Sequence, residues 1–219
     1  MRLDIERLFE DRPFHVGDNT YDSRFRRLLA RDAWNELEPA IQRRFTKRLK
    51  GAEVAVYRGE ILETRLSKAG WLLSQLCRLI GAPLPLFRGG RVAAVVVVSE
   101  DEQTGGQRWT RIYHRRRNNP QVINSAKVFD GSTGLEEHVG GGIGMALRVE
   151  AARDRLTFTS DHYFVGMGRV RFRLPRWCSP GVTKVTHRDL GDGRFAFDLD
   201  VRHDLFGEVA HQHAVFRDE

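Results

Sequence analysis

The stretch of sequence with the greatest chemical potential runs from Arg108 to Val122 and reads RWTRIYHRRRNNPQV. Its first half has the composition of a β-strand, in which alternate side chains point to opposite faces. Trp109, Arg111 and Tyr113 therefore share one face. Since a guanidinium can hold an anionic group while two aromatic rings cover an apolar body, we predict that this face contacts a ligand.

A carboxylate that can pair with Arg111 lies in the later stretch GLEEHV. Glu137 falls on the same face of this predicted strand as Leu135 and Val139, so we expect it to point inward among apolar side chains. A buried charge needs a partner, and we predict an ion pair between Glu137 and Arg111 on neighbouring strands. Two interpretations of the pair stay open: a structural ion pair, or an anchor for a ligand.

Other patterns indicate no specific chemistry. The run GGGIG, Gly140–Gly144, lacks the flanking strand and helix of a phosphate-binding unit and predicts a flexible or bulged hairpin. His211 and His213 share a strand face, but the spacing places no carboxylate beside them, so no metal site is predicted. The sequence has neither a Ser-His-Asp order nor a GxSxG elbow. We predict no cofactor and name no catalytic residue, which leaves the question of enzyme activity open.

The charge of the chain indicates its partners only weakly. Lys and Arg number 36 against 29 Asp and Glu, and the formal charge of +7 suggests an anionic partner. The arginines are scattered, however, and the basic run Arg115–Arg117 follows the one strand that combines basic and aromatic residues. A nucleic-acid surface needs several such strands side by side, so nucleic-acid binding is not expected.

Two features predict a cytoplasmic protein. Cys77 and Cys178 lie far apart in the sequence and outside any metal-binding motif, so both are predicted to be reduced thiols. The first 21 residues carry acids among their apolar residues and lack the apolar core of a signal peptide. We interpret residues 1–21 as an N-terminal tail and residues 22–219 as a single domain.

Three helices are predicted in the first 83 residues. Ser23 is a suitable N-cap for the first helix. Pro39 opens the second, in which Ile41, Phe45 and Leu49 recur every four residues. A short strand, AEVAVYRG, precedes the third helix, ETRLSKAGWLLSQLCRLIGAPLP.

The third helix allows two interpretations. It is predicted to end at Gly81 and Pro83, and it carries more apolar residues than one buried face requires. Lys68, Gln75 and Arg78 interrupt these residues, so the helix is too polar to span a membrane. We predict that it packs under a sheet; the alternative is that this basic, Trp- and Leu-rich helix lies in a membrane interface.

From Arg91 onward, apolar residues recur at every second position, as in β-strands. Polar or Gly-containing breaks such as SEDEQTGG and LGDG separate the strands as hairpin loops do. Strands never alternate with helices in this part, which argues against a parallel sheet. We therefore predict an α+β fold, with one large curved antiparallel sheet, a meander, packed against about three N-terminal helices.

The sequence around residue 175 predicts a strand followed by a break in the sheet. In RVRFRLP apolar residues alternate with arginines, which predicts a half-buried strand. The next stretch, LPRWCSPG, contains Pro175 and Pro180, which cannot donate to a sheet, so the sheet should break there. Trp177 between the prolines is expected to pack across one end of the sheet, where it either seals the core or lines the mouth of a pocket.

Five short motifs follow one another along the chain: LEPAIQRRF, WTR at Trp109–Arg111, LEEHVG with Glu137 and Gly140, LPRWCSP at Leu174–Pro180, and FAFDLDV…FGEVAHQHAVF. By their order and spacing, from about Tyr21 to the C-terminus, the chain resembles a bacterial family catalogued as domain of unknown function 4166. Members of that family occur alone or attached to nicotinamide-dependent oxidoreductase-like domains. The resemblance implies no activity, but it marks six positions that the family pattern uses: Trp109, Arg111, Glu137, Pro175, Trp177 and Pro180.

These inferences lead to two hypotheses of function. The first is a non-enzymatic binding module that holds an apolar or amphipathic ligand, a lipid or an acyl compound, between the curved sheet and the helix Ala69–Ile80. The second, which the family's fusions imply, is an accessory or catalytic domain that acts with a nicotinamide-dependent oxidoreductase. The ligand contacts expected under the first hypothesis are Trp109, Arg111, Tyr113, Glu137 and Trp177.

Overall fold

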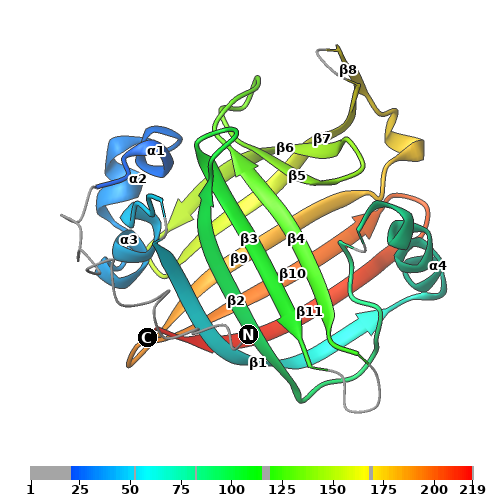
Figure 1. Cartoon of the computed structure of the whole chain (residues 1–219), viewed down its shortest axis with the longest axis horizontal. Coiled ribbons are helices and arrows are strands. Elements are labelled where there is room, and N and C mark those ends of the chain that lie inside the picture. Colours follow the sequence, from blue (N-terminus) through cyan, green and yellow to red (C-terminus); the bar gives the residue numbers. More distant parts are fainter. Residues whose placement is uncertain (1–20, 52, 82, 115–118, 168–169, 219) are drawn as a thin grey trace, which may run out of the picture.

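The computed structural model describes residues 21–51, 53–81, 83–114, 119–167 and 170–218. In these residues eleven strands form one antiparallel sheet (Figure 1). Ten of them pair in the order in which they follow one another along the chain, and the last of the ten pairs with the first. This ring consists of β1 (Val54–Leu66), β2 (Val92–Asp101), β3 (Gly106–Tyr113), β4 (Gln121–Val128), β5 (Glu136–Gly140), β6 (Ile143–Ala152), β7 (Arg155–Met167), β9 (Val182–Gly191), β10 (Arg194–His203) and β11 (Gly207–Arg217).

The ring is a closed antiparallel β-barrel, so the prediction of an α+β fold with an open curved sheet is wrong. The pairing that closes the barrel joins β1 to β11, from Arg58 opposite Arg217 to Leu66 opposite Ala210. Antiparallel strands twist and coil, and ten of them in a meander bring the two edge strands together. The alternation in the sequence shows where the strands lie, but it contains no signal for which two edges meet.

Helices cover the two ends of the barrel instead of one face of a sheet (Figure 1). At one end lie α1 (Arg24–Arg27), α2 (Arg31–Asn35) and α3 (Pro39–Thr46), and we refer to it as the α1–α3 end. Apolar side chains of this helical region form a buried cluster with side chains of β6 and β7: Phe25, Trp34, Leu37, Ile41, Phe45, Leu147, Leu156 and Phe158.

The N-terminal helices agree only in part with the prediction. Pro39 occupies the first turn of α3, as predicted, and Ile41 and Phe45 of its apolar stripe are buried. The helix ends at Thr46, however, so Leu49, the third residue of the predicted stripe, lies beyond it and packs in another cluster. The first predicted helix is divided into α1 and α2, and the Ser23 side chain makes no capping hydrogen bond. The predicted tail, residues 1–21, lies outside the described residues apart from Tyr21, which forms a β-bridge with the residue after α3. The basic run Arg115–Arg117 also lies outside them.

The opposite end of the barrel carries α4 (Lys68–Leu76) and the 3-10 helix η2 (Cys77–Ile80), and we call it the α4 end. The predicted third helix is too long at its start, because β1 stays paired with β11 through Leu66. The Ser67 hydroxyl caps α4 by accepting a hydrogen bond from the Gly70 amide at 3.1 Å. No helix within the described ranges is long and apolar enough to cross a membrane.

Glycines let α4 and η2 pack closely on the barrel. Gly70 lies against the Val209 carbonyl oxygen of β11, where a Cβ atom would collide with it. Gly81, with a φ of 100°, ends η2 as predicted. The predicted bulged hairpin of the GGGIG run is confirmed by a register shift at Gly140. Gly140 packs on the Ile80 carbonyl, so this hairpin supports the end of η2.

Strand β8 (Val170–Arg173) stands outside the barrel wall. It pairs only with the last residues of β7, and all four of its side chains are exposed, so the prediction of a half-buried strand is wrong. The ring is complete through β6, β7 and β9, which leaves β8 no inner face to cover. The next segment leaves the sheet, as predicted, in the 3-10 helix η3 (Arg176–Cys178). Trp177 is 76% exposed, which contradicts the expectation that it packs across one end of the sheet.

Candidate ligand-binding cavity

The two halves of the barrel interior differ in how they are filled. Toward the α1–α3 end, His187 lies among Phe45, Phe195 and Phe197, with ring centroids 5.0 to 5.2 Å from its own. From the middle of the barrel to α4, a cavity of about 290 Å³ remains. Ten strands enclose a wider interior than the eight whose side chains just fill a barrel, so packing in one half leaves space in the other.

The cavity is lined mainly by apolar side chains. Most come from the strands of the barrel, and α4 and η2 close the space from the end. The prediction that the third helix packs against the strands is confirmed for one side of α4 and η2 only, because Leu72, Leu76 and Leu79 are exposed. Representative apolar lining residues are Leu73, Ile80, Ile123, Met145, Leu199 and Val201.

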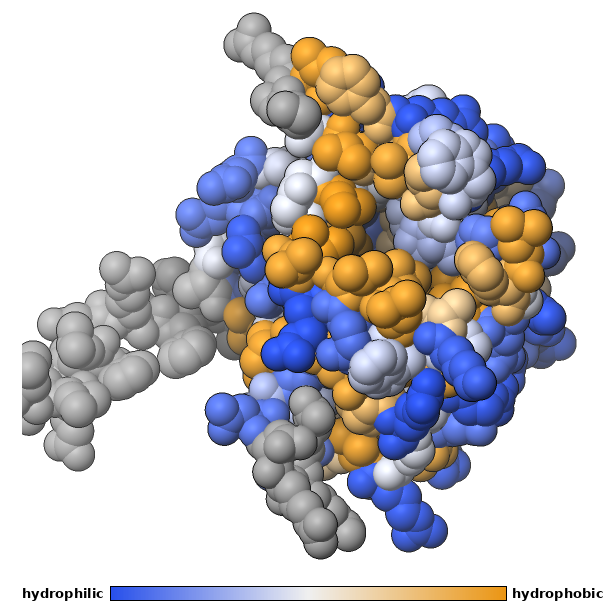
Figure 2. All heavy atoms as spheres, turned by 90° about the vertical axis from the view of Figure 1, so that its right-hand side faces the viewer, coloured by the Kyte–Doolittle hydropathy of each residue, from blue (hydrophilic) through white to orange (hydrophobic). Residues whose placement is uncertain are grey.

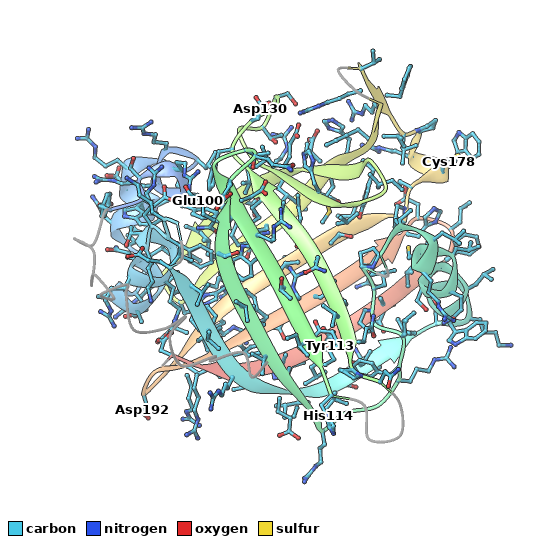
Figure 3. All side chains as sticks on the ribbon, in the orientation of Figure 1. Glu100, Tyr113, His114, Asp130, Cys178 and Asp192 are labelled. Atoms are coloured by element: carbon cyan, nitrogen blue, oxygen red, sulfur yellow. The ribbon has the colours of Figure 1, made fainter. Side chains whose placement is uncertain are left out.

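Part of the cavity wall is not a strand. β9 pairs with β7 only as far as Thr159, and β8 pairs with β7 from Phe164 onward, so the residues between them have no strand partner on that edge. The segment from β8 to β9 crosses this gap, and its Leu174, Cys178 and Pro180 line the cavity. Cys178 is an exposed residue of η3 (Figure 3). Because it also lines the cavity, we place the opening of the cavity beside it. We call this opening the mouth.

Strand β3 supplies the face that the sequence predicts for a ligand. Trp109, Arg111 and Tyr113 all line the cavity, so their shared inward face is confirmed. Trp109 donates from Nε1 to Gln107 Oε1 at 3.2 Å, and the Tyr113 hydroxyl donates to Gln212 Oε1 at 3.3 Å. Because these bonds satisfy the polar atoms of both side chains, their ring faces remain as apolar surface.

The predicted ion pair between Arg111 and Glu137 is confirmed, with Nη2 and Oε1 3.3 Å apart. The two residues do not lie on neighbouring strands, however, because β4 runs between β3 and β5. From β4, Lys127 adds a second cation, whose Nζ lies 2.8 Å from Glu137 Oε2. Ser125 accepts a hydrogen bond from Arg111 Nη1 at 3.1 Å. We call Arg111, Lys127 and Glu137 the charge cluster.

Burial and charge together set the ionisation of the cluster. Burial acts to raise the pKa of Glu137, but the charges of Lys127 and Arg111 outweigh it and lower that pKa to about 2. Burial lowers the pKa of Lys127, and the Glu137 carboxylate opposes this shift. The ammonium also lies 5.1 Å from the ring centre of Phe158, within the range of a cation–π contact. Glu137 is therefore an ionised carboxylate held from two sides.

One cation of the cluster is presented to the cavity. Lys127 and Glu137 are almost fully buried, whereas 25% of the Arg111 side chain is accessible. A guanidinium has five N–H donors, more than its bonds to Ser125 and Glu137 use. Among the described lining residues two are basic and one is acidic, so an anionic group beside Arg111 would balance the charge.

A family model described as "Domain of unknown function (DUF4166)" matches residues 37–216. The chain belongs to this family. The match runs from α3 almost to the end of β11 and therefore covers the whole barrel, in agreement with the resemblance seen in the short motifs. Neither a curated protein nor a solved structure matches the chain. The description of the family names no activity.

Four of the five predicted ligand contacts line the cavity of this DUF4166 chain, and their role as contacts stays a prediction. Trp177 does not line it, because the 3-10 turn directs its neighbour Cys178 inward and leaves the indole in solvent. The four lining residues are Trp109, Arg111, Tyr113 and Glu137.

Several polar lining residues are absent from the sequence-based prediction, among them Lys127 and Tyr163. Lys127 is in phase with Ile123 and Ser125 along β4, so the alternation that identifies Glu137 would also have identified Lys127. The Tyr163 hydroxyl lies 2.5 Å from Thr183 Oγ1, across the gap between β7 and β9. Burial raises the pKa of Tyr163 to about 12. No local sequence signal brings Tyr163 and Thr183 together, because the segment with β8 and η3 separates them in the chain.

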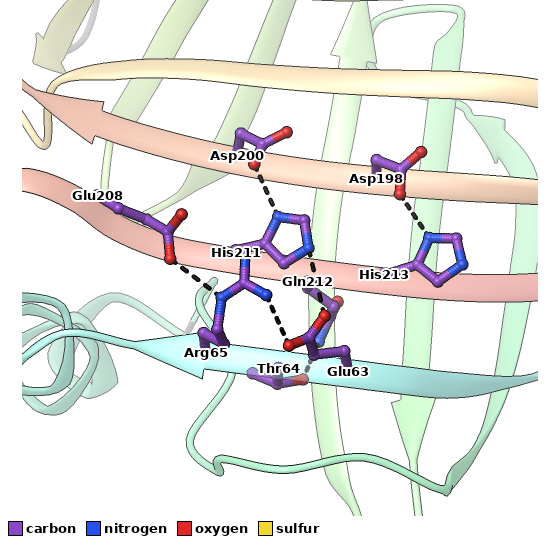
Figure 4. Close-up of polar contacts among 9 residues, drawn as sticks. All are labelled: Glu63, Thr64, Arg65, Asp198, Asp200, Glu208, His211, Gln212 and His213. Carbon is purple, nitrogen blue, oxygen red and sulfur yellow. Dashed lines mark hydrogen bonds and ion pairs between the residues drawn. The ribbon is translucent and has the colours of Figure 1, made fainter.

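The histidines of the HQH motif lie on the outer face of the barrel, since Gln212 between them lines the cavity (Figure 4). His211 Nδ1 is 2.7 Å from Asp200 Oδ1, and His213 Nδ1 is 2.5 Å from Asp198 Oδ1. Both aspartates belong to β10, so each pair joins two neighbouring strands. Within the part of the chain that the structure describes, no group of three or more His, Cys, Asp or Glu residues is arranged to hold a metal ion.

Proposed function

We propose that the barrel binds an amphipathic small molecule whose anionic group contacts Arg111 and whose apolar body fills the cavity. The observation that carries the proposal is a largely apolar cavity with one accessible cation in its wall. Small-molecule sites commonly have this composition, with many apolar contacts and a few polar groups that fix the orientation of the ligand.

The cavity volume limits the size of the apolar body. A volume of about 290 Å³ lies near the lower limit of typical small-molecule sites, which span about 300 to 1,000 Å³. An engineered apolar cavity of about 150 Å³ accommodates benzene, so this one suits a body roughly twice that size. A single acyl chain of medium length or a small ring system fits this estimate better than a phospholipid with two chains.

The charge cluster favours a carboxylate or a similar anion as the head group. Arg111 can offer parallel N–H donors to two oxygens, a geometry that guanidinium groups use with carboxylates. Lys127 and Glu137 neutralise each other behind it, so the positive charge of Arg111 is only partly compensated. Trp109 and Tyr113, on either side of Arg111 along β3, would contact the first part of the apolar body.

The chemistry of the lining favours binding over a reaction. Burial raises the pKa of Cys77, which keeps its thiol protonated and weakly nucleophilic. Glu137, with a pKa of about 2, is a poor proton acceptor at neutral pH. Tyr163 is paired with Thr183 and holds its proton to a pKa of about 12. The alternative of a domain that acts with a nicotinamide-dependent oxidoreductase rests on the family resemblance alone.

Fluorescence quenching by a brominated fatty acid tests the proposal. In a Trp71→Phe/Trp177→Phe protein, which changes two exposed positions, Trp109 reports on the cavity and Trp34 on the α1–α3 end. We expect 12-bromododecanoic acid to quench part of the emission in a saturable way. The corresponding alcohol, 12-bromododecanol, should bind about tenfold or more weakly, because it lacks the charge that Arg111 recognises.

Two arginines of β3 provide a matched pair of variants. Arg111→Met removes the accessible cation and should weaken binding of the acid at least about tenfold, while binding of the alcohol changes little. Arg108→Met, on the outer face of the same strand, should leave both affinities unchanged. The absence of saturable quenching would overturn the proposal, and so would an equal effect of the two substitutions.

A further inference from the structure

The surface around the mouth is rich in exposed apolar side chains. Figure 2 views the molecule from the α4 side and shows apolar residues gathered around a hollow. On α4 and η2, Leu72, Leu76 and Leu79 are exposed, the last of them to 87%. The other side of the same helices, with Leu73 and Ile80, lines the cavity. A helix that is apolar on both sides is normally covered on both.

Two further segments extend this surface at the same end. β8 and η3 contribute two exposed aromatic side chains, and the turn between β10 and β11 contributes two more exposed apolar side chains. We use the name apolar rim for seven of the exposed apolar side chains of these elements: Leu72, Leu76, Leu79, Phe172, Trp177, Leu205 and Phe206.

Close backbone contacts place the three parts of the rim beside one another. Gly70 of α4 packs on Val209, three residues after Phe206. Gly181, which follows η3, packs on the carbonyl of Arg202 at the end of β10. The turn between β10 and β11 therefore lies between α4 and η3, and the rim is one surface.

The segments that carry the rim are basic. Residues 67–91 contain no Asp or Glu and four basic residues: Lys68, Arg78, Arg88 and Arg91. Residues 170–184 also contain no Asp or Glu and four basic residues: Arg171, Arg173, Arg176 and Lys184. The whole chain, in contrast, has 29 acidic residues to 36 basic ones. Asp204, in the turn between β10 and β11, and the contacts of Arg171 with Glu136 and Asp130 reduce this excess without removing it.

We infer that the α4 end docks on the surface of an anionic lipid bilayer. The rim side chains enter the boundary between head groups and acyl chains, and the surrounding basic residues contact lipid phosphates. A second copy of the chain fits this surface poorly, because two copies meeting through it would bring like charges together. The docking surface goes beyond the proposed ligand and does not depend on it, although it would turn the mouth toward the bilayer.

Sedimentation with lipid vesicles tests the inference on the intact protein without an added ligand. We expect binding to vesicles of phosphatidylglycerol and phosphatidylcholine in equal parts, and on the order of tenfold weaker binding to phosphatidylcholine alone. Raising the salt from about 0.1 M to about 0.5 M should weaken the first interaction, because salt screens exposed charges. Little or no binding to the acidic vesicles would overturn the inference.

Variants at the two ends of the barrel distinguish docking through the α4 end from non-specific binding to vesicles. Leu76→Ser/Leu79→Ser and Arg173→Gln/Arg176→Gln should each reduce binding to acidic vesicles on the order of tenfold. The matched controls, Val54→Ser/Leu190→Ser and Arg26→Gln/Arg27→Gln, change exposed residues at the α1–α3 end and should bind like the original protein. Equal losses in the controls would contradict the inference.

A second readout on the unsubstituted protein covers the case in which a variant fails to fold. The emission of Trp177 should shift to shorter wavelength with acidic vesicles, and a Trp177→Phe protein should lose most of that shift. Sedimentation velocity tests the alternative in which a second copy of the chain, and not a lipid surface, covers the rim. A dimer that Leu76→Ser/Leu79→Ser dissociates, together with an unshifted emission, would show that a second copy covers this end and that the lipid inference is wrong.

Discussion

The two ends of the barrel are covered by helices in different ways. At the α1–α3 end, three short helices bury nearly all of their apolar side chains in one cluster with the strands. At the α4 end, a single helix and its 3-10 extension leave Leu72, Leu76 and Leu79 in solvent and a cavity of about 290 Å³ beneath them. The first end is built for stability, and the second keeps an accessible space.

Polar contacts show the same difference. Arg44 of α3 pairs with Asp189 at 2.8 Å and with Asp218 at 2.6 Å, and the amide of Glu38 donates to the Arg153 carbonyl at 2.8 Å. These contacts fix the helices to three different turns or strand ends of the barrel. The corresponding contact of α4 lies at its start, where the Ser67 amide donates to the Val209 carbonyl at 3.1 Å. Regions that admit ligands are generally drawn from the less stable parts of a protein, and the α4 end has that character.

The largest expected effect is at the α1–α3 end. Phe25 is fully buried and meets the rings of Phe45, Phe129 and Phe158. Phe25→Ala should lower the free energy of unfolding by about 3 to 5 kcal/mol, because it removes a buried ring and leaves a cavity. Urea denaturation measures this loss. Phe172→Ala on β8 is the matched control, and a loss of similar size there would contradict the difference between the two ends.

The next largest loss in the free energy of unfolding is expected for a substitution in the charge cluster. Glu137→Gln leaves Lys127 and Arg111 without their carboxylate, so we expect a loss of about 3 to 5 kcal/mol in the free energy of unfolding. Lys127→Met/Glu137→Leu removes the two most buried charges together and should cost much less, because Arg111 remains accessible from the cavity. Denaturant titrations of both proteins test the prediction. A double variant as unstable as Glu137→Gln would mean that packing, not charge, dominates here.

A third prediction concerns pH and the packed half of the interior. Burial, together with the charge of Arg44, lowers the pKa of His187 from 6.5 to about 3. Within the described residues neither ring nitrogen has a hydrogen-bond partner. Below pH 6.5 the unfolded chain therefore binds a proton that the folded protein rejects, so stability falls as the pH falls toward 3. Between pH 7 and pH 5 the loss from this residue should be about 2 kcal/mol.

His187→Phe isolates this contribution. Phenylalanine fits among Phe45, Phe195 and Phe197 and does not titrate, so the variant should lose less stability between pH 7 and pH 5 than the original protein. Glu137 does not interfere in this range. Its pKa falls from 4.5 to about 2 on folding, and its contribution to stability is lost only below about pH 4.5. Equal pH dependence in the two proteins would show that His187 is not the titrating group.

The sequence predicts the wall of the barrel much better than its closure. Each strand has one face toward the interior, so alternation alone places Trp109, Arg111 and Glu137 inward. Closure depends on the pairing of β1 with β11, whose partners are 144 (Leu66 and Ala210) to 159 (Arg58 and Arg217) positions apart in the sequence. No periodic pattern encodes such a pairing, because it results from the cumulative twist of all the strands between them.

The same distinction applies to the candidate site. The ion pair of Arg111 and Glu137 follows from two local patterns and the need of a buried charge for a partner. Trp177 is misplaced because a tryptophan between two prolines gives no information about which side of a 3-10 turn faces the barrel. The prediction that the third helix packs under a sheet holds for one side of α4 only, since the apolar character of its residues does not reveal that the barrel leaves the other side exposed.

The smallest effect on stability is expected at the α4 end, in contrast to the large effect at the α1–α3 end. Leu76 and Leu79 are exposed, and their removal takes little apolar surface out of the folded protein. Leu76→Ser/Leu79→Ser should therefore change the free energy of unfolding by no more than about 0.5 kcal/mol, as is usual for exposed positions. Circular dichroism during urea denaturation measures the change. A loss above about 1 kcal/mol would mean that these leucines stabilise the fold, as Phe25 does, and that their exposure does not indicate a binding partner. An unchanged stability leaves two large apolar side chains in water without benefit to the fold, and exposed apolar patches of this kind mark interaction surfaces.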